Sequence, residues 1–242
     1  MNWQDLIGKI TCADCLDIMK DIPNESIDLV CTDCPYHIAN QGGAGRCLKK
    51  WQTPGQIENY ENVRTGKMFA HNEIEFEDWL PEIYRVLKDN THCYIMINGR
   101  NLAELQKQAE KVGFIYQNLL VWEKNNATPN KFYMQQLEFI LMLRKGGERW
   151  INNLGHKNLL SVPNTLGGKN HPTEKPVPLM EILIANSTNE NDIVLEPFAG
   201  AGATCIAAKN LNRRFIGIEI DENYAKIAQE RLEQEQKQLL MF

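Results

Sequence analysis

Apolar and polar residues follow two periodicities along this chain, and the two alternate. Short runs of aliphatic and β-branched residues, typical of buried strands, are separated by longer segments whose apolar residues recur every three or four positions, as in amphipathic helices. This alternation predicts an α/β fold with a mostly parallel sheet and helices on both of its faces. Seven strands are predicted, at residues 9–13, 27–32, 92–97, 115–122, 137–143, 193–196 and 215–219. Helices are predicted at residues 75–87, 102–112, 177–187, 204–211 and 222–236.

Two stretches depart from this alternation. Residues 38–72 and 144–176 are rich in glycine or proline and contain few periodic apolar positions. Connections between elements are usually about 4–6 residues long, so stretches of this length are either functional or disordered. We predict a single domain over residues 1–242, in which residues 38–72 form a long flexible loop.

The composition is that of an ordinary soluble protein, with 43% hydrophobic and 24% charged residues. No apolar run approaches the roughly 20 residues of a membrane span, and no secretory signal is visible, so we expect a cytoplasmic protein without a membrane partner. Seven cysteines, an odd number, indicate reduced thiols. The net charge of −5 argues weakly against a polyanionic partner, but residues 120–175 contain eight basic and four acidic residues, a local charge of +4.

The cysteine spacing raises the question of a metal site. Cys12-x-x-Cys15 and Cys31-x-x-Cys34 have the separation of a zinc ribbon. Cys31, however, lies inside the predicted strand at 27–32, whereas zinc ligands normally project from turns. The two strands concerned are not expected to be neighbours in the sheet. Because cysteine is also one of the commonest buried small residues, we expect no metal.

A glycine-rich turn follows the predicted strand at 193–196 and leads into a helix. Its sequence is Glu196-Pro197-Phe198-Ala199-Gly200-Ala201-Gly202. Glycines let a ligand approach the backbone, and the start of the new helix offers free N–H groups. Glu219, at the end of the next strand, can bind both hydroxyls of a ribose, as in dinucleotide sites. A nicotinamide dinucleotide and S-adenosylmethionine both fit this pattern, but Glu196 suits a cationic amino-acid tail better than a diphosphate and favours the sulfonium cofactor.

The buried strand at 27–32 leads directly into Asp33-Cys34-Pro35-Tyr36. Ligands of parallel sheets bind at the carboxyl ends of the strands, which makes this tetrapeptide a candidate catalytic segment. An exocyclic amine is a poor nucleophile because its lone pair is conjugated with the ring. A carboxylate and a backbone carbonyl, each accepting one N–H, can hold such an amine in a reactive geometry. Asp33 and the carbonyl of Cys34 are the candidates for these two acceptors.

Both segments resemble those of a known family. Asp33-Cys34-Pro35-Tyr36 resembles the Asp-Pro-Pro-Tyr motif of DNA amino-methyltransferases, and the glycine turn resembles their first motif. The chain departs from the pattern at Cys34, which keeps the carbonyl but lacks the rigidity of a second proline. The tetrapeptide precedes the glycine turn, as in the β group of these enzymes. The resemblance implies a class I S-adenosylmethionine-dependent methyltransferase fold, Rossmann-like, with seven strands of which the last is antiparallel.

The resemblance implies methyl transfer to the N6 amino group of adenine in a specific DNA sequence. Leaving the double helix costs the target base a few kcal/mol, and stacking on Tyr36 would offset part of that cost. Only one helix follows Glu219, so the strand at 9–13 is expected to supply the third cofactor strand. Asp14, at its end, would then bind the adenine of the cofactor, although a helix N-cap explains Asp14 equally well.

The resemblance also extends to the segment before the helix at 177–187, which lines the methionine end of the cofactor in this family. The residues predicted to bind S-adenosylmethionine are therefore Asp14, Thr173, Lys175, Glu196, Phe198, Gly200, Gly202, Thr204 and Glu219. Double-stranded DNA is the implied partner, with residues 144–176 as a DNA-recognition region. The candidates for DNA contact are His37, Arg46, Lys49, Lys50, Lys124, Lys131, Arg144, Lys145 and Arg149. A homodimer and a cognate restriction endonuclease are open as further partners.

Four alternatives stay open from the sequence, one of which is a methyltransferase that acts on RNA or on protein amides. Methylation of cytosine N4 shares every step, although a serine at position 33 would have favoured it over Asp33. A catalytically inactive DNA-binding module and a nicotinamide-dependent oxidoreductase are the rivals from other classes. Binding of S-adenosylhomocysteine but not of NAD(H) would eliminate the oxidoreductase.

Overall fold

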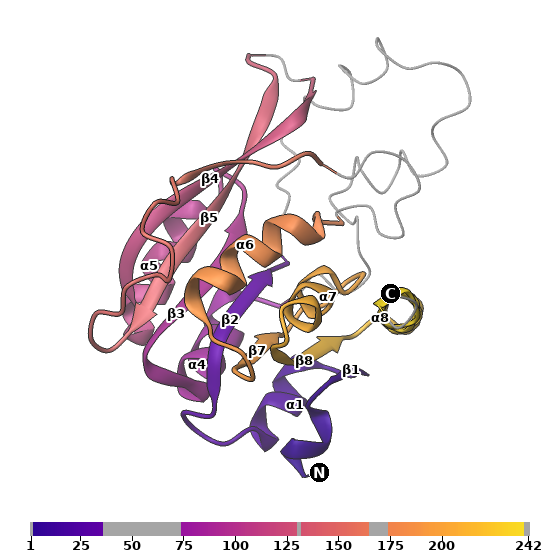
Figure 1. Ribbon diagram of the computed structural model, residues 1–242. Helices are drawn as coiled ribbons and strands as arrows, with labels where there is room; N and C mark the ends of the chain where they lie inside the picture. Colours follow the sequence, from indigo (N-terminus) through magenta and orange to yellow (C-terminus); the bar gives the residue numbers. More distant parts are fainter. Residues whose placement is uncertain (1, 36–73, 130–131, 165–173, 240–242) are drawn as a thin grey trace.

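The structure is a computed structural model, and it describes residues 2–35, 74–129, 132–164 and 174–239. These residues form one α/β unit with a central sheet (Figure 1). The elements in chain order are a short 3-10 helix (Trp3–Leu6), β1 (Lys9–Cys12), α1 (Cys15–Asp21), β2 (Ile27–Asp33), α4 (Phe76–Val86), β3 (Leu87–Ile97), α5 (Leu102–Val112), β4 (Ile115–Thr128), β5 (Gln135–Lys145), β6 (Leu159–Ser161), α6 (Val177–Ser187), β7 (Ile193–Glu196), α7 (Ala203–Asn210), β8 (Arg214–Glu219) and α8 (Glu222–Leu239).

The described residues build an eight-stranded sheet in the order β1-β8-β7-β2-β3-β5-β4-β6. Strands β1, β8, β7, β2 and β3 pair in parallel, and β5 runs antiparallel to both β3 and β4. Strand β1 pairs in parallel with β8, which agrees with the expectation that the strand at 9–13 lies beside the cofactor strands. We call the end of the sheet where the parallel strands finish the carboxyl end, and the opposite one the amino end.

The predicted fold class is confirmed, with differences in detail. The sheet has eight strands instead of seven, because Leu159–Ser161 pairs in parallel with β4 inside a stretch predicted to be a loop. A strand of three residues is too short to show a period of two. The antiparallel strand is β5, which lies within the sheet between β3 and β4.

Two hydrophobic clusters cover the two faces of the sheet. One cluster packs α1, α4 and α5 against the strands, with Trp79 and Ile83 among its buried residues. The other packs α6, α7 and α8 against the opposite face, with Leu183 and Ile206 buried (Figure 1). The central strands β2 and β7 are buried on both faces for this reason, which is why their sequences read as nearly continuous apolar runs.

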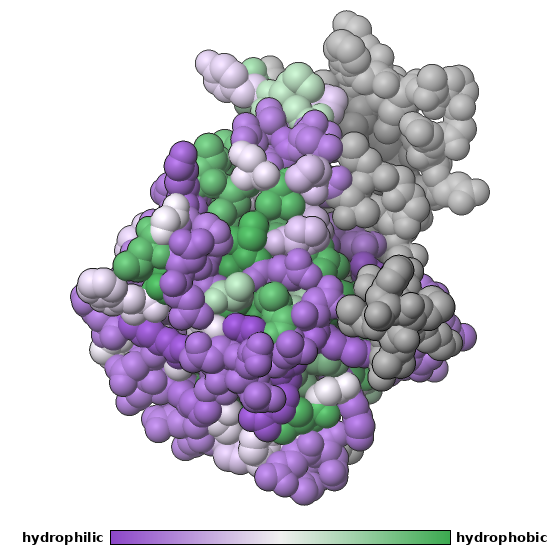
Figure 2. Space-filling view, in the orientation of Figure 1, coloured by the Kyte–Doolittle hydropathy of each residue, from purple (hydrophilic) through white to green (hydrophobic). Residues whose placement is uncertain are grey.

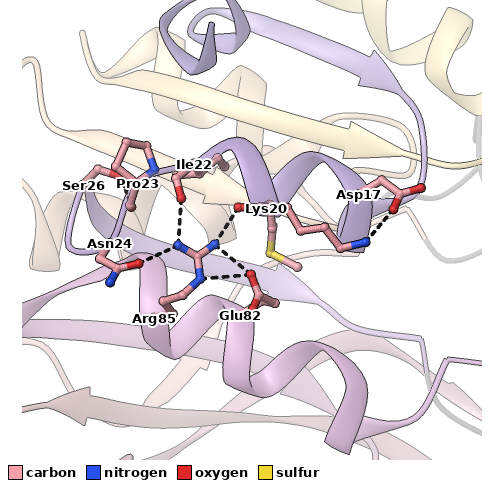
Figure 3. A network of polar contacts seen from close by, with 9 residues as sticks. Asp17, Lys20, Ile22, Pro23, Asn24, Ser26, Glu82 and Arg85 are labelled. Carbon is pink, nitrogen blue, oxygen red and sulfur yellow. Dashed lines mark hydrogen bonds and ion pairs between the residues drawn. The ribbon is translucent and has the colours of Figure 1, made fainter. Parts of the chain in front are cut away.

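Arg85 on α4 holds the C-terminal end of α1 in place through several hydrogen bonds (Figure 3). Its guanidinium donates to the carbonyls of Met19 and Ile22 and to the side chain of Asn24, at 2.7, 2.8 and 2.8 Å. Glu82, one turn earlier on α4, accepts two further hydrogen bonds from the same guanidinium. The planar group therefore satisfies carbonyls at the C-terminal end of α1 and fixes where the chain enters β2.

The ends of β4 and β5 reach beyond the neighbouring strands (Figure 1). Apolar side chains interrupt the polar surface at this hairpin end, where Phe132 and Tyr133 are each 87% exposed (Figure 2). Among the described helices, none is long and apolar enough to cross a membrane. The described cysteines all have free thiols.

Candidate active site at the carboxyl end of the sheet

The predicted site residues that the structure describes gather mainly at the carboxyl end of three adjacent strands. Asp33 ends β2, Glu196 ends β7 and Glu219 ends β8. The catalytic tetrapeptide and the glycine turn are far apart in sequence, but β2 and β7 pair directly through Leu29 and Val194. This is the position at which open α/β sheets bind their ligands.

The glycine turn is held in place by Glu219. One carboxylate oxygen accepts from the backbone N–H of Gly200 at 2.7 Å, and the other accepts from Asp221 at 2.9 Å. Gly202 has a φ of +81°, and a Cβ there would lie 3.0 Å from the Cβ of Ala228. Only glycine combines this left-handed backbone with so close an approach of helix α8. Burial raises the pKa of the Glu219 carboxyl, and the two backbone N–H groups oppose that rise.

Helix α7 opens directly from this turn, with Gly202 as its N-cap, and a glycine has no side chain that could cap the helix. Its first N–H groups are therefore available to an anionic group such as the carboxylate of an amino acid. The turn thus combines an uncapped helix start with a carboxylate at the end of β8. This donor and acceptor set fits the amino-acid and ribose parts of S-adenosylmethionine.

Glu196 is buried, with 3% of its surface exposed, and it connects strand β2 with the glycine turn. Its carboxyl accepts hydrogen bonds from the hydroxyls of Thr32 on β2 and Thr204 on α7, and from the N–H of Phe198. Burial raises the pKa of Glu196 to about 8, against the opposing effect of these donors. Such an arrangement clamps the catalytic strand to the glycine turn. It does not support the prediction that Glu196 meets a cationic tail directly.

Asp33 protrudes from the end of β2, and its side chain is 23% exposed. Its Oδ2 atom accepts from the ammonium of Lys175 at 2.7 Å, whereas Oδ1 has no hydrogen-bond partner among the described residues. Burial raises the pKa of the Asp33 carboxyl, and the charge of Lys175 opposes that rise. Cys34, directly after it, is buried and donates its thiol to the carbonyl of Met96 at 3.6 Å. One oxygen of Asp33 is thus held while the other is available.

Lys175 connects Asp33 to a carboxylate that the sequence did not reveal. Its ammonium lies 3.4 Å from Glu138 on β5, and Glu138 pairs with Lys124 on β4 at 3.0 Å. Lys124 thus lies beside the active site, at the carboxyl end of the sheet. Glu138 precedes a run of apolar residues in an ordinary-looking strand, and no local motif marks it. Its role follows only from the antiparallel pairing of β5 with β3.

Arg231 on α8 is a second residue without a sequence signal. It forms an ion pair with Glu174 at 2.9 Å and donates to the carbonyl of Ala201 in the glycine turn. It therefore joins the turn to the segment that contains Lys175.

The other described cofactor candidates also lie at this end. Asp14 is the N-cap of α1 and accepts from the N–H of Leu16 at 2.8 Å, which confirms the capping interpretation. The neighbouring residue Ala13 bonds to the carbonyl of Glu219, so Asp14 lies close to the ribose candidate. Phe198 packs edge-on against Trp79, with ring centroids 5.2 Å apart.

Three of the residues predicted to contact DNA lie at the end of the sheet opposite Asp33. Because β5 runs antiparallel, Arg144 and Lys145 pair with the first part of β3, opposite the end that holds Asp33. Arg149 follows them, and its carbonyl contacts His92 at the same end. Lys145 is also buried, donating to the carbonyl of Leu87 at 2.8 Å. These positions do not support the prediction that the first part of residues 144–176 meets DNA at the active site.

Several predictions lie outside the described residues. They concern the loop at 38–72 and the residues Tyr36, His37, Arg46, Lys49, Lys50, Lys131 and Thr173. For the cysteine pairs, the sheet order separates β1 from β2 by two strands. Cys31 is buried with its thiol 3.9 Å from the sulfur of Met180, as expected of a core residue.

Comparison with known proteins places this site in a family. The family model described as DNA methylase matches residues 27–163 and 148–230. The chain belongs to this family of DNA methylases. It is 30% identical to the Type II methyltransferase M2.DpnII of Streptococcus pneumoniae, over 92% of this chain and 88% of the relative. It is also 30% identical to the DNA adenine methyltransferase YhdJ of Escherichia coli, over 91% of this chain and 81% of the relative.

A solved structure agrees with these relatives. The complex of M1.HpyAVI with S-adenosylmethionine superposes with a TM-score of 0.69 at 29% identity, covering 92% of this chain and 98% of that one. The methylase is therefore a DNA methyltransferase that uses S-adenosylmethionine, and the predicted β-group DNA amino-methyltransferase family is confirmed. The glycine turn, the open start of α7 and Glu219 fit this cofactor.

Proposed function

We propose that this methylase transfers the methyl group of S-adenosylmethionine to the N6 amino group of adenine in a specific DNA sequence. The observation that supports this most directly is the position of Asp33. It lies at the carboxyl end of β2, beside the strand of the glycine turn, and keeps one oxygen without a partner among the described residues. The name of the relative YhdJ, a DNA adenine methyltransferase, agrees with the proposal.

The chemistry assigns one task to each acceptor of the tetrapeptide. The Asp33 Oδ1 atom accepts one hydrogen of the target amine and the carbonyl of Cys34 accepts the other, which draws the nitrogen out of conjugation with the ring. The sulfonium of the cofactor supplies an electrophilic methyl group. The nitrogen loses one proton as it becomes a secondary amine, and the Asp33 carboxylate is the base that the site offers for it.

The target base must leave the double helix before this chemistry can occur. Extrusion of the base costs a few kcal/mol, and stacking of the base on one aromatic ring offsets about 1–3 kcal/mol of this cost. We assign this stacking to Tyr36, three residues beyond Asp33 in the tetrapeptide, and to Pro35 the rigid backbone that leads to it.

For the cofactor, we propose that Glu219 binds the ribose hydroxyls and Asp14 the adenine amino group. The uncapped N–H groups at the start of α7 would receive the carboxylate of the amino-acid part. Gly200, Gly202 and Phe198 would shape the floor of this pocket, whereas Glu196 and Thr204 would hold its turn rigid from beneath. Thr173 is assigned to the methionine end with the segment that contains Glu174.

One experiment tests the substrate directly. DNA methylated by the purified protein with S-adenosylmethionine is digested to nucleosides, and the products are weighed by mass spectrometry. We expect N6-methyldeoxyadenosine. Appearance of N4-methyldeoxycytidine instead would overturn the assignment of adenine while leaving the amine chemistry intact.

We also propose that the methylation protects its site from a cognate restriction endonuclease, as the Type II name of the S. pneumoniae relative suggests. Methylated plasmid should then resist cleavage by one endonuclease of matching specificity. Sedimentation of the protein with and without DNA would test the homodimer that the sequence left open.

A further inference from the structure

Four charged side chains from four segments form a chain of ion pairs at the active site. Asp33 on β2 pairs with Lys175 before α6 at 2.7 Å, and Lys175 pairs with Glu138 on β5 at 3.4 Å. Glu138 in turn pairs with Lys124 on β4 at 3.0 Å. Negative and positive charges alternate along this row of four side chains, so each charge lies beside an opposite charge.

Lys175 is buried, and this makes its ion pairs with the neighbouring carboxylates important. Its side chain is only 8% exposed, and a lysine buried to that extent requires compensation by carboxylates or hydrogen bonds. The closer of its two carboxylates is Asp33, whose burial favours the protonated acid. A protonated Asp33 could not serve as an acceptor for the target amine in the same way, so the ammonium beside it has a functional consequence.

We propose that Lys175 and Glu138 are positioning residues for methyl transfer, Lys175 holding Asp33 ionised with Oδ1 directed at the target amine, and Glu138 holding Lys175 in place. This inference rests on the proposed role of Asp33. It moves Lys175 from the methionine end of the cofactor, where the sequence placed it, to the catalytic carboxylate. Lys124 completes the pairing of Glu138.

The groups facing Asp33 set the direction of the expected pH effects. Among the described residues these are Lys175, Glu138, the carboxyl of Glu196 on β7 and the thiol of Cys34. Burial raises the pKa of the Cys34 thiol, which is therefore uncharged at neutral pH. Glu138 behaves differently: burial works to raise its pKa, but Lys175 and Lys124 outweigh burial and lower it. Glu138 is thus a lasting negative charge that disfavours ionisation of Asp33, while Lys175 favours it.

The opposite signs provide the test. The rate of single-turnover methylation of DNA with saturating S-adenosylmethionine is measured from pH 5 to pH 9. The acid limb, which is the part of this profile where the rate rises from low pH, reports ionisation of the catalytic carboxylate. Lys175→Met should move the acid limb to higher pH and reduce the rate at its low-pH end about tenfold, with recovery as the pH rises. Glu138→Gln should move the same limb to lower pH, because it removes a negative charge near Asp33 while its amide oxygen can still accept a hydrogen bond from Lys175 and hold it in place. Lys175→Arg should bring the limb back toward its wild-type position, because it keeps the charge.

The matched control is Lys145→Met. Lys145 is also 8% exposed and also lies near two carboxylates, but at the amino end of the sheet. Its replacement should leave the acid limb unchanged. Limbs that coincide for Lys175→Met, Glu138→Gln and the wild type would overturn the proposal. If Lys175→Met does not fold, the direction of the Glu138→Gln shift decides the question alone.

Two further measurements distinguish this inference from a role of Lys175 in cofactor binding and from the proposed adenine specificity. Equilibrium binding of S-adenosylhomocysteine should be the same for Lys175→Met as for the wild type. Weakened binding without a shift of the acid limb would return Lys175 to the cofactor and overturn the inference. The identity of the methylated nucleoside tests the proposed adenine specificity, and a cytosine product would refute that specificity without affecting the limb shifts.

Discussion

The two ends of strand β2 each have an aspartate paired with a lysine, yet the two aspartates are bonded differently. At the amino end, Asp28 uses both oxygens: one pairs with Lys88 at 2.6 Å and the other accepts from the N–H of Ile193 at 2.9 Å. At the carboxyl end, Asp33 uses Oδ2 for Lys175 and keeps Oδ1 without a partner among the described residues. Asp28 therefore stabilises the fold with both of its oxygens, whereas Asp33 keeps one oxygen with which it can receive a substrate.

The buried lysines of the two ends differ in the same way. Lys145 is satisfied at the amino end by the carbonyl of Leu87 and by the ring of Tyr84, and its two carboxylates are more than half exposed to water. The carboxylates of Lys175 are largely enclosed, at 23% and 27% exposed. Pairs screened by water contribute little, so the charge of Lys145 has little effect beyond its own site. The charge of Lys175 acts on groups that water screens poorly.

The largest expected effect concerns the two aspartates of β2. Asp33→Asn should lower the rate of methyl transfer by about 10²- to 10⁴-fold, because it removes the anionic acceptor of the target amine. Binding of S-adenosylhomocysteine, measured by calorimetry, should be retained. Asp28→Asn is the matched change at the other end and should cost about 1–3 kcal/mol of unfolding free energy with little loss of activity per folded molecule. Similar activities for the two variants would end the distinction between the two ends.

A smaller effect is expected at Glu219, the other working carboxylate of the carboxyl end. Glu219→Ala should weaken binding of S-adenosylhomocysteine about 10- to 100-fold, since hydrogen bonds to a charged group contribute about 1.5–3 kcal/mol. The rate at saturating cofactor should fall much less. An unchanged dissociation constant would contradict the placement of the ribose.

The pH dependence of stability should reveal Glu196, the clamp between β2 and the glycine turn. Its pKa is raised in the folded protein from an ordinary value near 4.5 to about 8, so the folded state binds the proton more tightly than the unfolded state does. The resulting stability is fully present below about pH 4.5 and is lost as the pH rises toward 8. Glu196→Gln should flatten this part of the melting-temperature curve. An equally steep curve for the variant would show that Glu196 ionises normally.

The smallest effect is expected at Cys34. Because the contribution proposed for Cys34 is its backbone carbonyl, Cys34→Ala should change the single-turnover rate by less than about threefold, since the thiol makes only a weak hydrogen bond. A loss of activity comparable to that of Asp33→Asn would show that the thiol itself takes part.

Much of the fold and of the cofactor turn could be predicted from the sequence, because their signals are local. Strands buried on both faces read as apolar runs, and the turn between β7 and α7 needs glycine at Gly202 for steric reasons. The three-residue strand β6 was missed because it is too short to show a period, and the sequence did not reveal that the hydroxyls of Thr32 and Thr204 bond to Glu196. Burial of a carboxyl is a property of its neighbours and cannot be read from its position in a strand.

The positions of the basic residues in the fold could not be predicted from local sequence. Residues 120–175 contain an excess of positive charge, and the sequence alone assigned this charge to DNA. The antiparallel direction of β5 divides it: Lys124 and Lys175 lie at the carboxyl end beside Asp33, while Arg144, Lys145 and Arg149 lie at the other end. The motifs Asp33-Cys34-Pro35-Tyr36 and the glycine turn could be recognised in the sequence because each is a contiguous segment. Which charges face Asp33 was settled only by the pairing of strands, because electrostatic effects depend on distance in space and not on separation along the chain.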